Sequence, residues 1–146
     1  MADLKRILHV DDDEDIRIIA NMALEMVGGF VVLQCDSGAE AVEKGAAFAP
    51  DLFLLDYMMP GMNGEETLLA LRKIPGLSRV PAVFMTARVQ ADVSEALLKR
   101  GALDVITKPF DPMELGAQLH EIWSKRGRKS LPWVEDSPGE FAPLPN

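Results

Sequence analysis

The sequence predicts an α/β domain with a five-stranded parallel sheet and helices on both faces. Short apolar segments rich in Val, Ile, Leu and Phe recur five times and show little alternation with polar residues, which is typical of strands buried on both faces. Helical periodicity fills the intervals between them. With 146 residues, 48% of them hydrophobic, the chain has the size and composition of one domain with a substantial core.

The apolar segments are the expected strands. They are RILHV from residue 6, FVVLQC from 30, DLFLLD from 51, VPAVFM from 80 and LDVIT from 103. Because helices alternate with these strands, the strands are expected to pair in parallel through crossover connections. With five strands we expect the flavodoxin-like order 2-1-3-4-5.

Each intervening helix has a local signal. The first has apolar residues at helical spacing before Gly28-Gly29, and the residues expected to face the core are Ile16, Ile19, Ala20, Ala23, Leu24 and Val27. Three capping boxes are predicted to begin further helices: Ser37-x-x-Glu40, Asn63-x-x-Glu66 and Asp111-x-x-Glu114, the last with Pro112 at the first helical position. The fourth helix is predicted over about 91–100, with Val93, Ala96 and Leu97 inward and Gly101 ending it.

Periodicity ends near Ser124. The stretch that follows, GRKSLPWVEDSPGEFAPLPN, contains four prolines and is too short for a second domain. We therefore expect one domain over residues 1–123 and a Pro-rich tail over 124–146. The tail is predicted either to pack loosely or to fold back, or dock on a partner, through Trp133 and Phe141.

Composition excludes several functional classes. A net charge of -8 argues against a nucleic-acid interface, and the basic run at 125–129 is interpreted as an exposed helix end. The single cysteine, Cys35, excludes an internal disulfide and a cysteine-cluster zinc site. No apolar run is long enough to span a membrane and no export leader is apparent, so we expect a cytoplasmic location.

Polar side chains follow four of the predicted strands. They are Asp11-Asp12-Asp13, Asp56, Thr86-Ala87 and Lys108-Pro109. Ligands of doubly wound sheets bind at the carboxyl ends of the strands, and in the expected order strands 1, 3, 4 and 5 are neighbours. We therefore expect carboxylates, a hydroxyl and an ammonium to meet at one rim.

Clustered carboxylates without a nearby histidine or thiol favour a hard cation such as Mg²⁺. An alternative is that the acidic run only caps the first helix, and we assign that role to Asp13, Glu14 and Asp15. Asp11 and Asp12 are predicted to serve the metal, because Asp56 and Lys108 arrive at the same rim. Held ionised by the metal and the ammonium, Asp56 would be a nucleophile toward phosphorus.

The motifs VDDDED, LLDYMMPGMNG, FMTA and TKPF resemble those of a response-regulator receiver domain of two-component signalling, of the chemotaxis-regulator kind, over residues 4–123. The resemblance implies that Asp56 is the phosphoacceptor, Thr86 the switch hydroxyl and Lys108 the phosphoryl-contacting ammonium, placed by a cis peptide to Pro109. It also implies that Asp12, Asp56 and the backbone carbonyl of Met58 bind Mg²⁺ directly, with Asp11 acting through water.

The resemblance further implies a phosphoprotein switch rather than an enzyme. The phosphoryl donor would be a histidine kinase or a histidine phosphotransfer protein, and the target would be a protein bound on the helix 4, strand 5 and helix 5 face. Two alternatives are weaker. A pseudo-receiver usually lacks an acid or the lysine, and none is missing here. An aspartyl-phosphate phosphatase needs a second acid where this chain has Met58.

This chain departs from the family pattern at strand 5. Receivers often carry a Tyr or Phe three residues before the lysine, whereas this chain has Val105, so activation is expected to travel through the Thr86 loop and helix 4. Met58 and Arg88 stand where receivers flank the hydrolytic water, and neither is suited to orient that water and accept its proton. We therefore expect a long-lived phosphorylated state. His9 and Cys35 are interpreted as packing residues.

Overall fold

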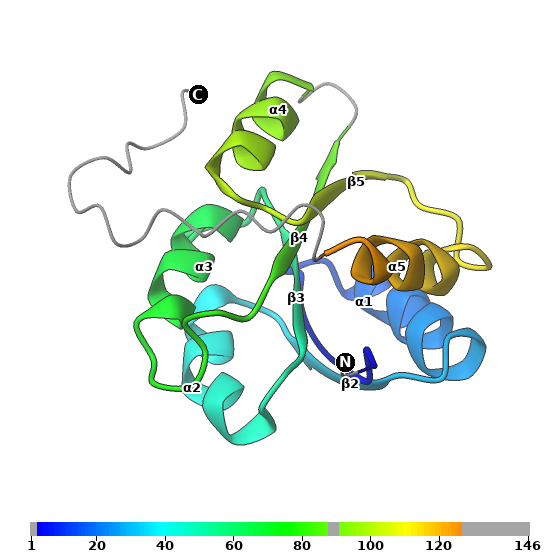
Figure 1. Cartoon of the computed structure of the whole chain (residues 1–146), viewed down its shortest axis with the longest axis horizontal. Helices are drawn as coiled ribbons and strands as arrows, with labels where there is room; N and C mark the ends of the chain where they lie inside the picture. Colours follow the sequence, from blue (N-terminus) through cyan, green and yellow to red (C-terminus); the bar gives the residue numbers. More distant parts are fainter. Residues whose placement is uncertain (1–2, 88–90, 127–146) are drawn as a thin grey trace.

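The computed structural model describes residues 3–87 and 91–126, which form a central sheet between two groups of helices (Figure 1). The strands are β1 (Arg6–Val10), β2 (Val31–Cys35), β3 (Leu52–Asp56), β4 (Ala82–Ala87) and β5 (Asp104–Lys108). All four pairings are parallel, and the strand order is β2-β1-β3-β4-β5. The predicted fold class and the flavodoxin-like order are confirmed.

The helices divide between the two faces of the sheet. They are α1 (Glu14–Asn21), the π-helical η1 (Met22–Val27), α2 (Gly38–Phe48), α3 (Gly64–Arg72), α4 (Ala91–Arg100) and α5 (Leu115–Ser124). α1, η1 and α5 cover one face, while α2, α3 and α4 cover the other (Figure 1). Successive strand residues therefore serve different cores: in β3, Phe53 and Leu55 pack toward α2–α4, whereas Leu52 and Leu54 pack toward α1 and α5.

The first helix begins as predicted and then departs from the α-helical period. Asp13 is the N-cap, because its carboxylate accepts hydrogen bonds from the backbone N–H groups of Asp15 and Ile16. After Asn21 the π-helical segment has more residues per turn, so the 3.6-residue spacing loses phase with the core. Val27, in this segment, is 48% exposed, and Ile19, which precedes it in α1, is 41% exposed, so the prediction that both face inward is wrong.

The three predicted capping boxes have different outcomes. Asn63 and Glu66 form the complete reciprocal pair at the start of α3. Ser37 caps α2, but the Glu40 carboxylate accepts from the N–H of Asp36 instead of that of Ser37.

The third box, at Asp111, is wrong. The Asp111 carboxylate accepts from the N–H of Met113, and α5 begins only at Leu115, so Pro112 lies in the preceding turn. A local turn has satisfied the aspartate before the helix starts.

The predicted fourth helix agrees with expectation. α4 spans Ala91–Arg100 with Leu97 buried, and Gly101, at a φ of 115°, ends it in a conformation that favours glycine. Residues 127–146, which include Trp133 and Phe141, lie outside the described residues. No described helix has the length and apolar character required to cross a membrane.

Candidate functional site

The carboxyl ends of four strands bring the predicted polar residues to one edge of the sheet. The parallel register pairs Asp56 with Met85 and Ala87 with Lys108, while Asp11 directly follows Val10, which pairs with Leu55. Asp11, Asp56, Thr86 and Lys108 therefore share one rim, as the strand order requires.

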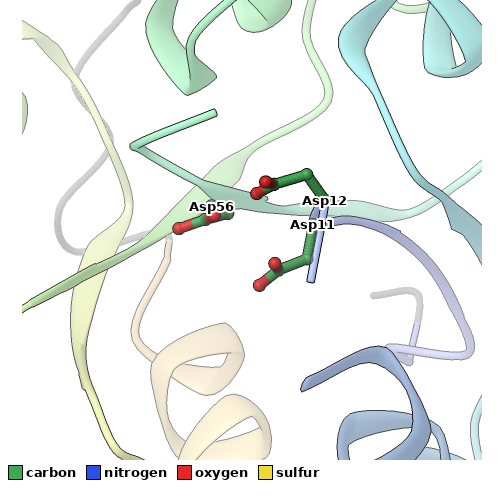
Figure 2. Close-up of side chains that lie close together, drawn as sticks. All are labelled: Asp11, Asp12 and Asp56. Atoms are coloured by element: carbon green, nitrogen blue, oxygen red, sulfur yellow. The ribbon is translucent and has the colours of Figure 1, made fainter. Parts of the chain in front are cut away.

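Three carboxylates gather at this rim. One carboxylate oxygen from each of Asp11, Asp12 and Asp56 lies within 4.8 Å of the other two. Figure 2 shows these side chains reaching from the ends of β1 and β3 toward the same space. Asp11 is fully buried and Asp56 is 5% exposed, whereas Asp12 is exposed to solvent. Of the three acids, Asp12 is therefore the one most open to solvent.

Lys108 joins two of the acids. Its Nζ lies 3.0 Å from Asp11 Oδ2 and 3.0 Å from Asp56 Oδ1, and its peptide bond to Pro109 is cis, as the resemblance implies. The other Asp11 oxygen, Oδ1, accepts a 3.0 Å hydrogen bond from the N–H of Asp13. Since one ammonium contacts two carboxylates of a cluster of three, acidic groups outnumber the ammonium in this cluster.

That imbalance governs the ionisation of Asp56. Burial raises the pKa of its carboxyl to about 6, the charge of Asp11 adds to the rise, and Lys108 opposes it. For Lys108, burial acts to lower the pKa, but the hydrogen bond to Asp11 and the charge of Asp56 outweigh it, so the net pKa is raised. The ammonium alone therefore does not keep Asp56 fully ionised. The expectation from the sequence was that a metal and the ammonium together do so, and added positive charge at the rim would lower this pKa.

Thr86 occupies the end of β4 and is 1% exposed. Its Oγ1 lies 3.2 Å from Oγ of Ser94, which is on α4. Val105 is half-buried in β5 beside Phe84 and packs against the core under α4. No sequence pattern had indicated Ser94.

The segment after Asp56 is held close to the site by Gly64. A Cβ at this position would lie 2.5 Å from the backbone oxygen of Asp56 and 2.9 Å from Cα of Tyr57, so a larger residue would push α3 away. The Gly64 N–H donates to the Tyr57 carbonyl at 2.8 Å. Met58 is 61% exposed beside the site, while Arg88 lies outside the described residues.

A series of hydrogen bonds that the sequence did not predict leads to the backbone carbonyl of Asp11. Arg17 Nη1 donates to the Asp11 carbonyl at 2.8 Å, and Gln34 Nε2 donates to the Arg17 carbonyl at 2.8 Å. Gln34 Nε2 also lies 3.0 Å from Nδ1 of His9. Burial, together with the charges of Lys108 and Arg17, lowers the pKa of His9 to about 3. His9 is thus a neutral buried residue, in agreement with its interpretation as a packing residue.

A second ion pair, also missed, joins the start of α3 to the end of α4. Arg100 Nη1 lies 2.5 Å from Glu65 Oε2, and the two side chains are 19% and 6% exposed. Glu65 directly follows Gly64, so this pair connects the segment after Asp56 to α4.

Comparison with known proteins gives consistent matches. Residues 7–120 match the family described as the response regulator receiver domain. The phosphate regulon transcriptional regulatory protein PhoB of Pseudomonas aeruginosa is 37% identical over 123 residues, which are 84% of this chain and 53% of that protein. The transcriptional regulatory protein CseB of Streptomyces avermitilis is 34% identical over 143 residues, 98% of this chain and 59% of that protein.

A solved structure also matches. The Vibrio cholerae chemotaxis protein CheY4 aligns with a TM-score of 0.73 and 27% identity, over 82% of this chain and 98% of that one. The chain spans about half the length of the curated relatives it matches.

Proposed function

Since the chain belongs to the response regulator receiver family, we propose that Asp56 accepts a phosphoryl group from the phosphohistidine of a histidine kinase or histidine phosphotransfer protein. The observation that carries this proposal is that one ammonium, that of Lys108, contacts two of the three acids. Lys108 Nζ contacts both Asp11 and Asp56 at 3.0 Å within a cluster of three carboxylates. A nearly buried acid between an ammonium and two further acids has the surroundings of a reactive group rather than of a surface charge.

The donor set fits Mg²⁺. The three carboxylates supply only oxygen ligands, close enough together for one ion, and their negative charge exceeds that of Lys108. Asp12, Asp56 and the backbone carbonyl of Met58 would hold the ion directly, and Asp11 would hold it through water. When bound, Mg²⁺ supplies positive charge that offsets the charge of the phosphoryl oxygens.

The residues of this chain then have distinct roles in transfer. An oxygen of the Asp56 carboxylate forms a bond to phosphorus as the phosphorus–nitrogen bond of the donor breaks, and the electron pair of that bond leaves with the imidazole. Lys108, already hydrogen-bonded to Asp56, donates to a phosphoryl oxygen. The Thr86 hydroxyl donates to another. The domain would therefore promote its own phosphorylation and also its own dephosphorylation, which would be slow. It would not be an enzyme for an external substrate.

The output would be contact with another protein through the face formed by α4, β5 and α5. On this face a groove of about 450 Å³ is lined by residues of β5, the following loop and α5, among them Val105, Phe110, Asp111 and Gln118. The mixture of apolar and acidic side chains suits a protein segment, and the net charge of -8 disfavours direct contact with nucleic acid. We further propose that residues 1–123 are the receiver, that residues 124–146 are a tail, and that the protein is cytoplasmic.

The test is phosphorylation by acetyl phosphate with Mg²⁺, followed as acid-stable, base-labile incorporation of label. We expect Asp56→Asn to abolish incorporation, because the amide is not a nucleophile toward phosphorus. Asp36→Asn is the matched control, since Asp36 is an exposed acid just beyond the carboxyl end of edge strand β2. It should be labelled like the wild type. Labelling of Asp56→Asn at the wild-type level would refute the assignment.

A further inference from the structure

The hydroxyl of Thr86 has a partner on α4. Oγ1 of Thr86 and Oγ of Ser94 lie 3.2 Å apart, and either can be the donor. Thr86 is almost completely buried and Ser94 is half-buried, so water competes little for this contact. Ser94 is in the first half of α4, eight residues beyond Thr86.

We propose that Ser94 is a positioning residue: it holds the Thr86 hydroxyl against α4 in the unphosphorylated domain, and phosphorylation breaks this hydrogen bond. The inference rests on the proposed function, because it concerns how Thr86 reaches a phosphoryl group on Asp56. It assigns to Ser94 a role that opposes activation.

The two contacts exclude each other because of where the Thr86 oxygen must lie, and not because of its bonding capacity, since a hydroxyl can donate one hydrogen bond and accept another. A β-branched side chain occupies discrete χ1 rotamers, so Oγ1 moves between separate positions rather than by small adjustments. The position seen here lies 3.2 Å from Ser94, on the side of α4. A phosphoryl group would lie at the rim, where Asp56 meets Lys108 and the exposed Asp12. Capture of the hydroxyl by that group therefore costs the bond to Ser94.

Side-chain contacts at both ends of α4 connect it to the rest of the domain. Ser94 connects its first half to β4, and Arg100 connects its last residue to Glu65 of α3. Loss of the Ser94 contact leaves the Arg100 contact in place, so the first half of α4 loses a contact with the domain while its last residue keeps one. This route suits a chain in which Val105 stands at the strand-5 position where an aromatic switch residue is common.

The first experiment measures binding of fluoroberyllate, an inorganic phosphoryl mimic, by calorimetry with saturating Mg²⁺. We expect Ser94→Ala to bind it about fivefold more tightly than wild type, because the competing hydrogen bond, with a typical net contribution of about 1 kcal/mol, is absent. Ser94→Thr keeps a hydroxyl and should restore the wild-type dissociation constant. Weaker binding by Ser94→Ala would mean that Ser94 supports Thr86 in the bound state and would overturn the proposal.

A double-mutant cycle separates this role from a general loosening of α4. In a Thr86→Ala background, Ser94→Ala should leave fluoroberyllate affinity unchanged, since no Thr86 hydroxyl remains to be released. Arg100→Gln, which removes the ion pair at the other end of α4, should not reproduce the tightening. An equal gain in Arg100→Gln, or a Ser94→Ala gain that persists without the Thr86 hydroxyl, would overturn the proposal.

Failure of the inference and failure of the proposed function remain distinguishable. If the wild type binds fluoroberyllate and Ser94→Ala has the same dissociation constant, only the role of Ser94 is refuted. Wild type that does not bind fluoroberyllate with Mg²⁺ refutes the phosphoacceptor assignment and this inference together.

Discussion

Two ion-pair clusters lie near the segment that follows β3, and they differ in their balance of charge. At the rim, Lys108 contacts Asp11 and Asp56, and a third acid, Asp12, lies in the same cluster. Between α3 and α4, the Glu65 carboxylate pairs with the Arg100 guanidinium. A balanced buried pair is complete without a ligand, whereas an unbalanced cluster is stabilised by any added cation. We therefore propose that the first cluster serves a reaction and that the second serves the structure.

The largest expected effect is on the balanced pair. Glu65→Gln removes the negative charge that faces the Arg100 guanidinium in a largely buried setting, and we expect a loss of about 2 kcal/mol in the free energy of unfolding. Urea denaturation measures this value. Asp36→Asn, an exposed substitution, should change stability by less than about 0.5 kcal/mol. If Glu65→Gln is equally harmless, the pair is not structural and the comparison fails.

The second-largest expected effect is stabilisation by Mg²⁺, which should depend on the rim and not on the Glu65–Arg100 pair. We expect the ion to raise the melting temperature of the wild type. At a Mg²⁺ concentration ten times the dissociation constant, the free energy of unfolding should rise by about 1.4 kcal/mol. This gain should vanish in Asp12→Ala and persist in Glu65→Gln. A full gain in Asp12→Ala would place the ion elsewhere.

A smaller effect is expected from neutralising Asp56 without metal. Because the pKa of Asp56 is raised in the folded state to about 6, its ionised form costs stability above that pH. Asp56→Asn should therefore be more stable than wild type at pH 7.5, by about 1 kcal/mol after allowance for solvent at the rim. Thermal melts should show this advantage shrinking as the pH falls below about 6 and disappearing at about pH 3, below both the folded and the unfolded pKa, where the wild-type carboxyl is protonated in both states. An advantage that does not change with pH would argue against this explanation.

The smallest expected effect concerns the lifetime of the phosphorylated state. Met58 is 61% exposed beside the site and offers no strong hydrogen bond to orient a water molecule. Met58→Asn supplies an amide that can hold the water, and we expect dephosphorylation to become about two to five times faster, as one added hydrogen bond would allow. Decay of the label after removal of the phosphodonor measures the rate, with Met58→Leu as the apolar control. Equal decay in Met58→Asn and Met58→Leu would mean that water orientation at this position does not set the lifetime.

The sheet, its strand order and the rim all follow from the amino-acid sequence alone. Strand-forming runs are local, and their alternation with helices limits the topology to few choices, so the pattern is sufficient to place the residues after each strand together. Asp13 as a helix cap and Asn63 with Glu66 as a capping box follow for the same reason. These hydrogen bonds join residues at most three apart, which a pattern can encode.

Contacts between side chains of different elements instead depend on tertiary packing. Ser94 against Thr86, Arg17 against the Asp11 carbonyl, and Glu65 against Arg100 depend on how α1, α3 and α4 pack on the sheet, and no spacing in the chain specifies that. The exposure of Ile19 likewise depends on how α1 packs on the sheet, and that of Val27 accompanies the π-helical turns after Asn21, which no periodicity indicates. The raised pKa of Asp56 belongs to the same class. Its largest cause is burial, and burial depends on the whole fold rather than on neighbouring residues.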